Sequence, residues 1–218
     1  MSILTLNNLC KLLIFTFLSS LFSCHDSSRH TPTNLQIPAH IFRSADIALR
    51  LGRSIESDLI ARSGDRSKSY SHIGLIIESD SGLIVVDIEP KTNSTSDKIK
   101  AQRIEDFFSS RKSLSGAVLR YNFSDSLAVN RLKTKCIESL NSTITFDYDY
   151  CLSDSTRMYC TELIEHIYQS TGFSLSEDRR HSLPLAAEAV ILPSDIALND
   201  NLTEIWSYDL RFEADSLR

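Results

Sequence analysis

Two runs rich in Ile, Val and Leu, residues 73–77 and 83–88, flank a short polar segment that ends in Gly82. Such residues favour strands, and a short Gly-containing turn between them predicts a β-hairpin. Both runs are nearly continuously apolar, which indicates strands that are covered on both faces. If the turn has even length and places Ser79 opposite Gly82, the numbers of paired residues sum to 161.

The rest of the chain supplies a mixture of helices and strands. Helical spacing of apolar residues predicts helices over residues 125–140 and 158–171, the second closed by Gly172. We also expect a strand at residues 57–61, a short helix at 98–108, a strand at 116–121, and a loop-rich tail after residue 182. These elements together predict an α+β domain.

The first residues have the order of an export signal. An apolar run over residues 12–22 follows Lys11 and precedes Ser23-Cys24. The run is shorter than the roughly 20 residues of a membrane span, and its order predicts a signal peptide over residues 1–23. Residues 21–24 also resemble a bacterial lipobox, which predicts lipidation of Cys24, a flexible tether over residues 24–40 and a domain over 41–218. A plain signal peptide and an uncleaved anchor are the alternatives. We expect a cell-envelope lipoprotein, otherwise a secreted protein.

Charge and cysteine usage exclude some functions. A net charge of −5, without any block of Lys and Arg, gives no support for nucleic-acid binding. No two cysteines have C-x-x-C spacing, so structural zinc is not expected. Cys136 and Cys151 are predicted either to form a disulfide or to remain two free thiols.

One cysteine and one histidine stand out as chemical candidates. Cys160 lies where the second long helix begins, and the positive end of a helix dipole favours a thiolate. The alternative is an inert, buried cysteine on the apolar face of that helix. His72 opens the first hairpin strand, with Gly74 leaving space on the same face. The other histidines are predicted to be solvated: His25, His30, His40, His166 and His181.

The hairpin register nominates an acid that orients the histidine. With pairs that sum to 161, His72 faces Glu89, and Asp87 lies diagonally across on the same face. A tighter register brings Asp87 directly opposite, and an odd-length loop turns both acids away. A carboxylate beside an imidazole holds its tautomer and stabilises the imidazolium. Asp87 is therefore the first candidate and Glu89 the reserve, and a pair of solvated acids is the alternative.

Five short motifs follow one another in an order that resembles a known family. They are Asp58-Leu59-Ile60, Tyr70-Ser71-His72-Ile73-Gly74, Val85-Val86-Asp87, Phe146-Asp147-Tyr148 and Tyr159-Cys160-Thr161-Glu162-Leu163. In this order they resemble the YiiX/YaeF-like family of circularly permuted, papain-like thiol hydrolases of the NlpC type. The resemblance runs from about residue 57 to 168. It implies a papain-like α+β domain in which the nucleophile helix packs on an antiparallel sheet, and the permutation places the histidine before the cysteine.

The resemblance also implies roles for individual residues. Cys160 matches the nucleophile, His72 the base, and Asp87 the orienting acid, although the family usually has Glu at that position. Thr161 replaces the more usual Ser, and the segment before Cys160 is one residue longer than usual, which leaves the partner of the family's Tyr-Asp motif open.

These residues predict a cysteine hydrolase that cleaves an amide bond through an acyl-enzyme. The backbone N–H of Cys160 is the expected oxyanion donor, Tyr70 and Tyr159 are expected to bind substrate, and no metal or organic cofactor is required. An envelope location favours cell-wall peptides as the substrate. The alternatives are a lipid ester or N-acyl amide, as handled by lecithin:retinol acyltransferase-like enzymes, and a non-catalytic lipoprotein that uses the fold for binding.

Overall fold

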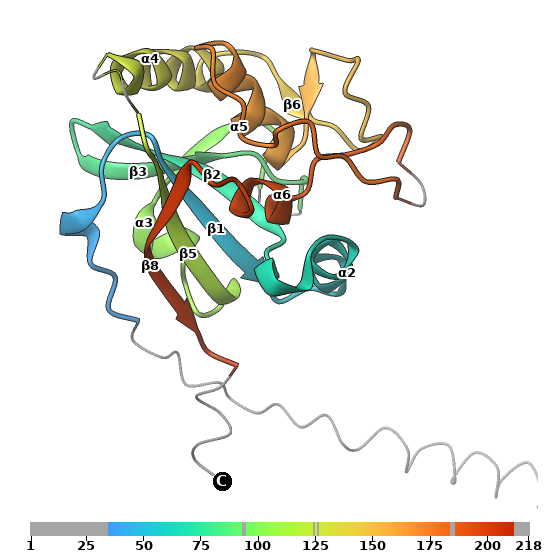
Figure 1. The fold of residues 1–218 in the computed structure, drawn as a ribbon, viewed down its shortest axis with the longest axis horizontal. Coiled ribbons are helices and arrows are strands. Elements are labelled where there is room, and N and C mark those ends of the chain that lie inside the picture. Colours follow the sequence, from blue (N-terminus) through green and yellow to red (C-terminus); the bar gives the residue numbers. More distant parts are fainter. Residues whose placement is uncertain (1–34, 93–94, 124, 126, 184–185, 212–218) are drawn as a thin grey trace, which may run out of the picture. The chain divides into compact units, whose positions relative to one another are not determined.

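An antiparallel sheet forms the centre of the described part of the chain. The structure is a computed structural model and describes residues 35–92, 95–123, 125, 127–183 and 186–211. Within these residues, six strands pair in the order β4-β3-β2-β1-β5-β8 (Figure 1). The strands are β1 Asp46–Gly52, β2 His72–Ser79, β3 Gly82–Asp87, β4 Lys100–Arg103, β5 Ser113–Tyr121 and β8 Leu202–Asp209. The predicted signal peptide, Cys24, His25, His30 and most of the predicted tether lie outside the described residues.

The hairpin of β2 and β3 has the predicted register. Ser79 pairs with Gly82 and Leu75 pairs with Val86, and Gly82 adopts a positive φ of 105° at the turn, where glycine is favoured. The first six residues of β2 are all buried. Their side chains alternate between two hydrophobic clusters, with Ile73 in one and Ile76 in the other, which confirms that both faces of the hairpin are covered.

Helices cover the two faces unequally. α4 (Ala128–Leu140) and α5 (Cys160–Gln169) lie side by side on the face that carries Ile73 (Figure 1). The opposite face carries a smaller aromatic cluster to which α3 (Ile104–Phe107) contributes. A two-residue parallel ladder, β6 (Thr145–Phe146) with β7 (Arg157–Met158), directly precedes α5. The ladder ends at Met158, and Tyr159 is the N-cap residue of α5.

Three expectations about secondary structure are wrong. Residues 57–61 lie in helix α2 (Ile55–Ser63), because Ser54 caps its first turn through Ser57 N–H. The segment 98–108 is only partly helical, since β4 pairs with β3 before α3 begins. The tail contains α6 (Pro193–Ala197) and the eight-residue edge strand β8. Short 3₁₀ turns, η2 (Ala39–Ile41) and η3 (Arg66–Lys68), complete the elements.

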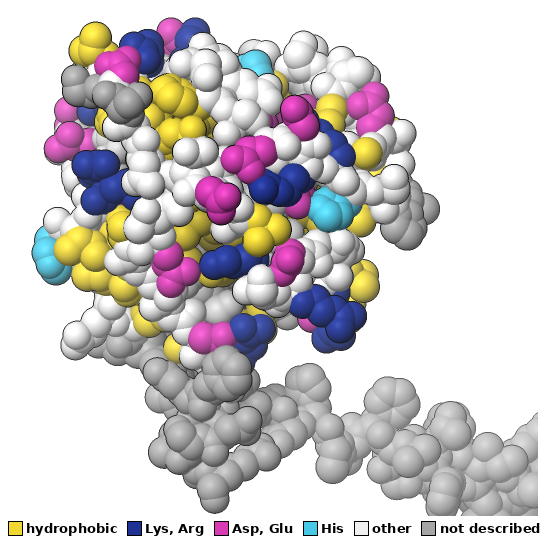
Figure 2. All heavy atoms as spheres, viewed as in Figure 1, with side chains coloured by type: hydrophobic (Ala, Val, Ile, Leu, Met, Phe, Trp, Pro, Cys, Tyr) yellow, Lys and Arg dark blue, Asp and Glu magenta, His cyan; other side chains and the backbone are white. Residues whose placement is uncertain are grey.

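The charges on the surface, the character of the helices and the state of the cysteines can be described for these residues. Acidic and basic side chains are interleaved over the face shown in Figure 2, without a patch of one sign. Among the described helices, none combines the length and the apolar character that crossing a membrane would need. Cys136, Cys151 and Cys160 are all unpaired, so the second of the two predicted alternatives for Cys136 and Cys151 applies here.

Candidate active site

His72 is held between a carboxylate and an aromatic ring. It is the first residue of β2 and is 8% exposed. Its Nε2 lies 2.7 Å from Oδ2 of Asp87, a completely buried residue at the end of β3. The imidazole stacks on Phe107 with the ring centroids 5.6 Å apart. The structure therefore brings together the histidine and the acid that the hairpin register nominated.

Gly74 allows the strand of Asp87 to approach. A Cβ at this position would lie 2.5 Å from Val85 Cγ1 and 3.3 Å from Asp87 Cβ. The space that we expected beside His72 is thus taken by the neighbouring strand. A larger residue at position 74 would push away the strand that carries the acid.

Asp87 is fixed by a side chain that sequence analysis missed. Gln102 on β4 donates its amide N–H groups to both carboxylate oxygens of Asp87, each at 3.0 Å. A buried carboxylate needs such partners, because leaving it unpaired is costly. No local pattern marks Gln102, since its role depends on β4 pairing next to β3.

Cys160 is the first residue of α5 and is partly exposed. Burial raises the pKa of its thiol, but a hydrogen bond with His72 and the positive charge of that ring oppose this. Contacts with the Thr161 hydroxyl and the Ile73 backbone N–H act in the same direction, and the pKa ends below its ordinary value of 9.0. The prediction of an inert, buried cysteine does not fit this environment.

The same contacts act on His72 in the opposite sense. Burial and the charge of Arg50 lower its pKa, whereas hydrogen bonds to Asp87 and Cys160 raise it, and the pKa reaches about 9. Since Nε2 faces Asp87, Nδ1 is the ring nitrogen left for the thiol. A lowered thiol pKa beside a raised imidazole pKa favours transfer of the thiol proton to the imidazole.

Glu89, the reserve acid, has other partners. One carboxylate oxygen pairs with Arg50 and the other with Lys100, and the nearer oxygen is 3.5 Å from His72 Nε2. Burial raises the pKa of Glu89, but the positive charges of His72, Arg50 and Lys100 prevail and lower it to about 2. The geometry therefore favours Asp87 over Glu89 as the residue that orients His72.

Tyr150 lies near the thiol and was not singled out from the sequence. Its backbone φ is +53°, a left-handed conformation that costs a non-glycine residue roughly 1–2 kcal/mol. Its ring packs on Tyr159 with the centroids 5.2 Å apart. Burial and then the nearby charge of Cys160 raise its pKa. The sequence at 148–150 offers two tyrosines around an aspartate, and nothing local distinguishes Tyr150 from Tyr148, which is exposed.

The two tyrosines that we expected to bind substrate are placed differently. Tyr159 is 3% exposed, and its hydroxyl accepts a hydrogen bond of 2.8 Å from Ile191 N–H. This placement argues against a role in lining a substrate pocket. Tyr70 is half-buried, and burial followed by the charges of Glu204 and Asp209 raises its pKa to about 12.

The remaining described histidines lie away from these contacts. His40 and His166 are exposed, as predicted. The prediction of a solvated His181 is wrong, because its Nε2 lies 2.7 Å from Oδ1 of the buried Asp195. The backbone of His181 also pairs with Val190, which folds this loop back onto α6.

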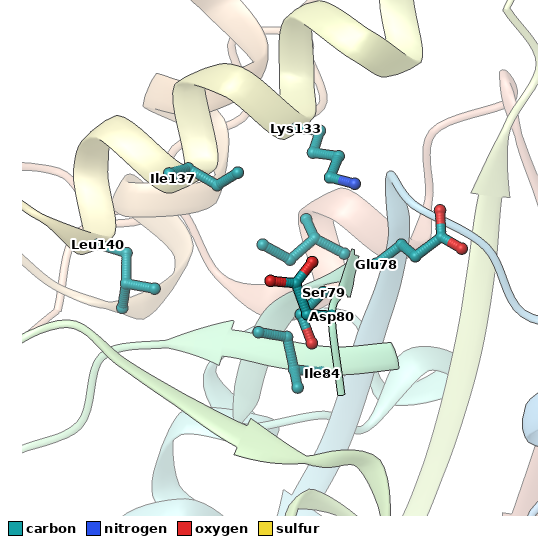
Figure 3. Close-up of a pocket in the computed structure, with 8 residues that line it drawn as sticks. Glu78, Ser79, Asp80, Ile84, Lys133, Ile137 and Leu140 are labelled. Atoms are coloured by element: carbon teal, nitrogen blue, oxygen red, sulfur yellow. The ribbon is translucent and has the colours of Figure 1, made fainter. Parts of the chain in front are cut away.

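A groove at the other end of the hairpin is separate from this site. It has a volume of about 490 Å³ and lies between α4 and the hairpin tip, with Ile137 and Lys133 on the helix side (Figure 3). Ser79, the last residue of β2, lines it, whereas His72 is the first residue of that strand. The groove therefore has no part in the contacts of Cys160.

Comparison with known proteins identifies the fold. No family model matches the sequence, and a search of curated proteins also finds no match. Among solved structures, the crystal structure of the metalloprotein YiiX from Escherichia coli O157:H7 matches with a TM-score of 0.61 and 17% identity. The match covers 76% of this chain and 97% of that chain. The chain has the YiiX fold. At this level of identity the YiiX likeness establishes the architecture, and it confirms the structural part of the resemblance found in the sequence.

Proposed function

We propose that this chain is a thiol hydrolase of the circularly permuted, papain-like kind that cleaves amide bonds. One imidazole supports this most directly: Nε2 of His72 lies 2.7 Å from the buried carboxylate of Asp87, and the interaction of His72 with the thiol of Cys160 opposes the effect of burial on the pKa values of both groups. A nucleophile, a base and an orienting acid in contact form the arrangement used for acyl transfer. In this proposal Cys160 is the nucleophile, His72 the base and Asp87 the orienting acid.

The reaction proceeds in two halves. The Cys160 thiolate attacks the carbonyl carbon, a C–S bond forms, and the carbonyl π electrons move onto oxygen. In this proposal the backbone N–H of Cys160, in the first turn of α5, donates to that oxyanion. The tetrahedral intermediate collapses, the C–N bond breaks, and the leaving nitrogen takes a proton from the His72 imidazolium. Water then gives a proton to His72 and attacks the thioester, which releases the acid and restores Cys160.

YiiX is a metalloprotein, but the residues of this chain do not fit a metal ion. Among the described residues, the group that offers metal-ligand atoms close together is His72, Asp87 and Glu89, with these atoms within 4.8 Å of one another. Both oxygens of Glu89 are engaged by Arg50 and Lys100. Two cationic side chains at that carboxylate oppose the approach of a divalent ion, so no step here runs through a metal.

The substrate and location follow from the N-terminal sequence. We propose that residues 1–23 are a signal peptide, that lipidated Cys24 with residues 24–40 tethers the domain at 41–218, and that cell-wall peptides are the substrate. The apolar run and the lipobox-like residues 21–24 support this proposal.

The test is product release from two substrate classes. Purified protein is incubated separately with peptidoglycan fragments and with phospholipid vesicles, and new amino groups and free fatty acid are measured. We expect amino groups to appear, to be lost in Cys160→Ala, and to persist in Cys151→Ser, a matched change at another partly exposed thiol. Fatty acid that depends on Cys160 would replace the proposal with a lipid esterase. If neither the wild type nor Cys160→Ala releases amino groups or fatty acid, the result would indicate a binding protein.

A further inference from the structure

We propose that Arg50 and Lys100 are the permanent cations of this site: by holding both oxygens of Glu89, they take the place of a metal ion beside His72 and Asp87. The inference rests on the proposed role of His72 as the base. It concerns how the negative charges of Asp87 and Glu89 are neutralised. Metal binding tests this without any enzymatic turnover.

Arg50 is built into the site from three sides. It is 6% exposed and lies directly opposite His72 on β1. Its guanidinium donates to Glu89 and, at 3.1 Å, to the backbone carbonyl of Phe107. The guanidinium carbon is also 4.8 Å from the centroid of the Phe107 ring, the ring on which His72 stacks. An arginine held in this way keeps one oxygen of Glu89 engaged.

Lys100 reaches the same carboxylate from the strand on the other flank of the hairpin. It lies on β4, pairs in register with Asp87 and forms an ion pair with the second oxygen of Glu89. Its side chain is 27% exposed, so it is the more accessible of the two cations. With both oxygens occupied, Glu89 has no oxygen directed only at His72.

The charges of the cluster balance without a metal. Asp87, Glu89 and the proposed Cys160 thiolate supply three negative charges, and Arg50, Lys100 and the proposed His72 imidazolium supply three positive ones. A divalent ion among these groups would leave two positive charges uncompensated in a largely buried place, which is strongly unfavourable. Zinc and similar ions take carboxylate and neutral imidazole ligands, and here the donor atoms of those residues already face protein partners.

The consequence for His72 is a single orienting acid. Glu89 is kept at 3.5 Å from Nε2, whereas Asp87 hydrogen-bonds it at 2.7 Å. Arg50 and Lys100 thus act as positioning residues that act through Glu89 and leave the His72–Asp87 pair to work as a unit.

The experiment measures metal binding in the Cys160→Ala background, because a thiolate is itself a strong zinc ligand. Full-length protein is titrated with Zn²⁺ by calorimetry and with Co²⁺ by visible absorption. We expect Lys100→Met to bind one Zn²⁺ per chain at least about tenfold tighter than its parent. A further Glu89→Gln change should abolish this gain. Lys98→Met is the matched control, since Lys98 is exposed and forms none of these contacts, and it should bind like the parent.

Two results would overturn the inference. One is a parent protein that already binds one Zn²⁺ through Glu89 as tightly as Lys100→Met does. The other is a Lys100→Met protein that gains no affinity. The same Zn²⁺ titration can be made with Arg50→Met if that variant folds, but the result with Lys100→Met is sufficient to decide whether the inference holds.

A separate readout uses the native thiol. Treatment of the wild type with a chelator should leave the alkylation rate of Cys160 unchanged, and a chelator-induced loss that Zn²⁺ restores would contradict the inference. Failure of every substrate to react, with these metal results as expected, would remove the proposed function and leave the assignment of the cations intact.

Discussion

The contact between Cys160 and His72 can be tested by replacing the histidine and measuring the reactivity of the thiol. A thiol with an ordinary pKa of 9.0 is about 1% ionised at pH 7, two units below, whereas a thiolate held by an imidazolium is mostly ionised. His72→Ala removes the group that lowers the pKa of Cys160 and leaves the burial that raises it. The ionised fraction should therefore fall about 100-fold.

The change in rate is smaller than the change in ionisation. A thiolate of lower pKa is intrinsically less nucleophilic, which offsets part of the gain. We therefore expect alkylation of Cys160 by iodoacetamide at pH 7 to slow by roughly 10- to 100-fold in His72→Ala. The wild-type rate should stay flat towards pH 9, where the His72 imidazolium loses its proton, whereas the rate in the variant should keep rising with pH.

The assay follows the Cys160 peptide by mass spectrometry in a Cys151→Ser background. Cys136 will not interfere, because burial raises its pKa to about 12. His166→Ala is the control, since this histidine is exposed on the same helix and its loss should leave the rate unchanged. A His72→Ala protein that alkylates at the wild-type rate at pH 7 would refute the thiolate–imidazolium pair.

Three further outcomes follow from the same geometry. Asp87→Asn should keep the fold but reduce turnover by roughly 10²- to 10⁴-fold, measured as kcat on whichever substrate reacts, because an amide cannot stabilise the imidazolium. Gly74→Ala should destabilise the protein by about 1–3 kcal/mol in urea denaturation, since its Cβ meets Val85 at 2.5 Å. Burial raises the pKa of Glu162 from 4.5 to about 8. Between these pH values the folded state binds a proton that the unfolded state has lost, so stability falls as pH rises through this range. Glu162→Gln should therefore reduce the difference between the urea midpoints measured at pH 5 and at pH 8.

The hairpin was predictable because local patterns determine it. The apolar runs and the turn at Gly82 were sufficient to predict the two strands, and an even loop gave the register that places Asp87 within reach of His72. The helix that begins at Cys160 was predictable for the same reason, since its apolar spacing is regular.

The edge strand and the first helix were not predictable from such patterns. β8 lies at the end of the sheet, and all eight of its residues are only partly buried or exposed, so its sequence lacks the continuous apolar run of β2. In α2, Ile55 and Leu59 are 79% and 60% exposed, and Ala61 is the only buried residue of the helix, so α2 lacks the apolar face that marks a packed helix. The cap at Ser54 was the informative feature.

The choice between Asp87 and Glu89 shows why part of a site is beyond local inference. Both acids alternate onto the same face as His72, so the hairpin register alone leaves two candidates. The decision comes from strands on either side: Arg50 on β1 and Lys100 on β4 engage Glu89, while Gln102 on β4 fixes Asp87. That β1 and β4 flank this hairpin is a property of the sheet order, which depends on contacts between residues far apart in the chain. In our proposals the two cations that engage Glu89 also oppose a metal ion, so the order of the strands accounts for both features of the site.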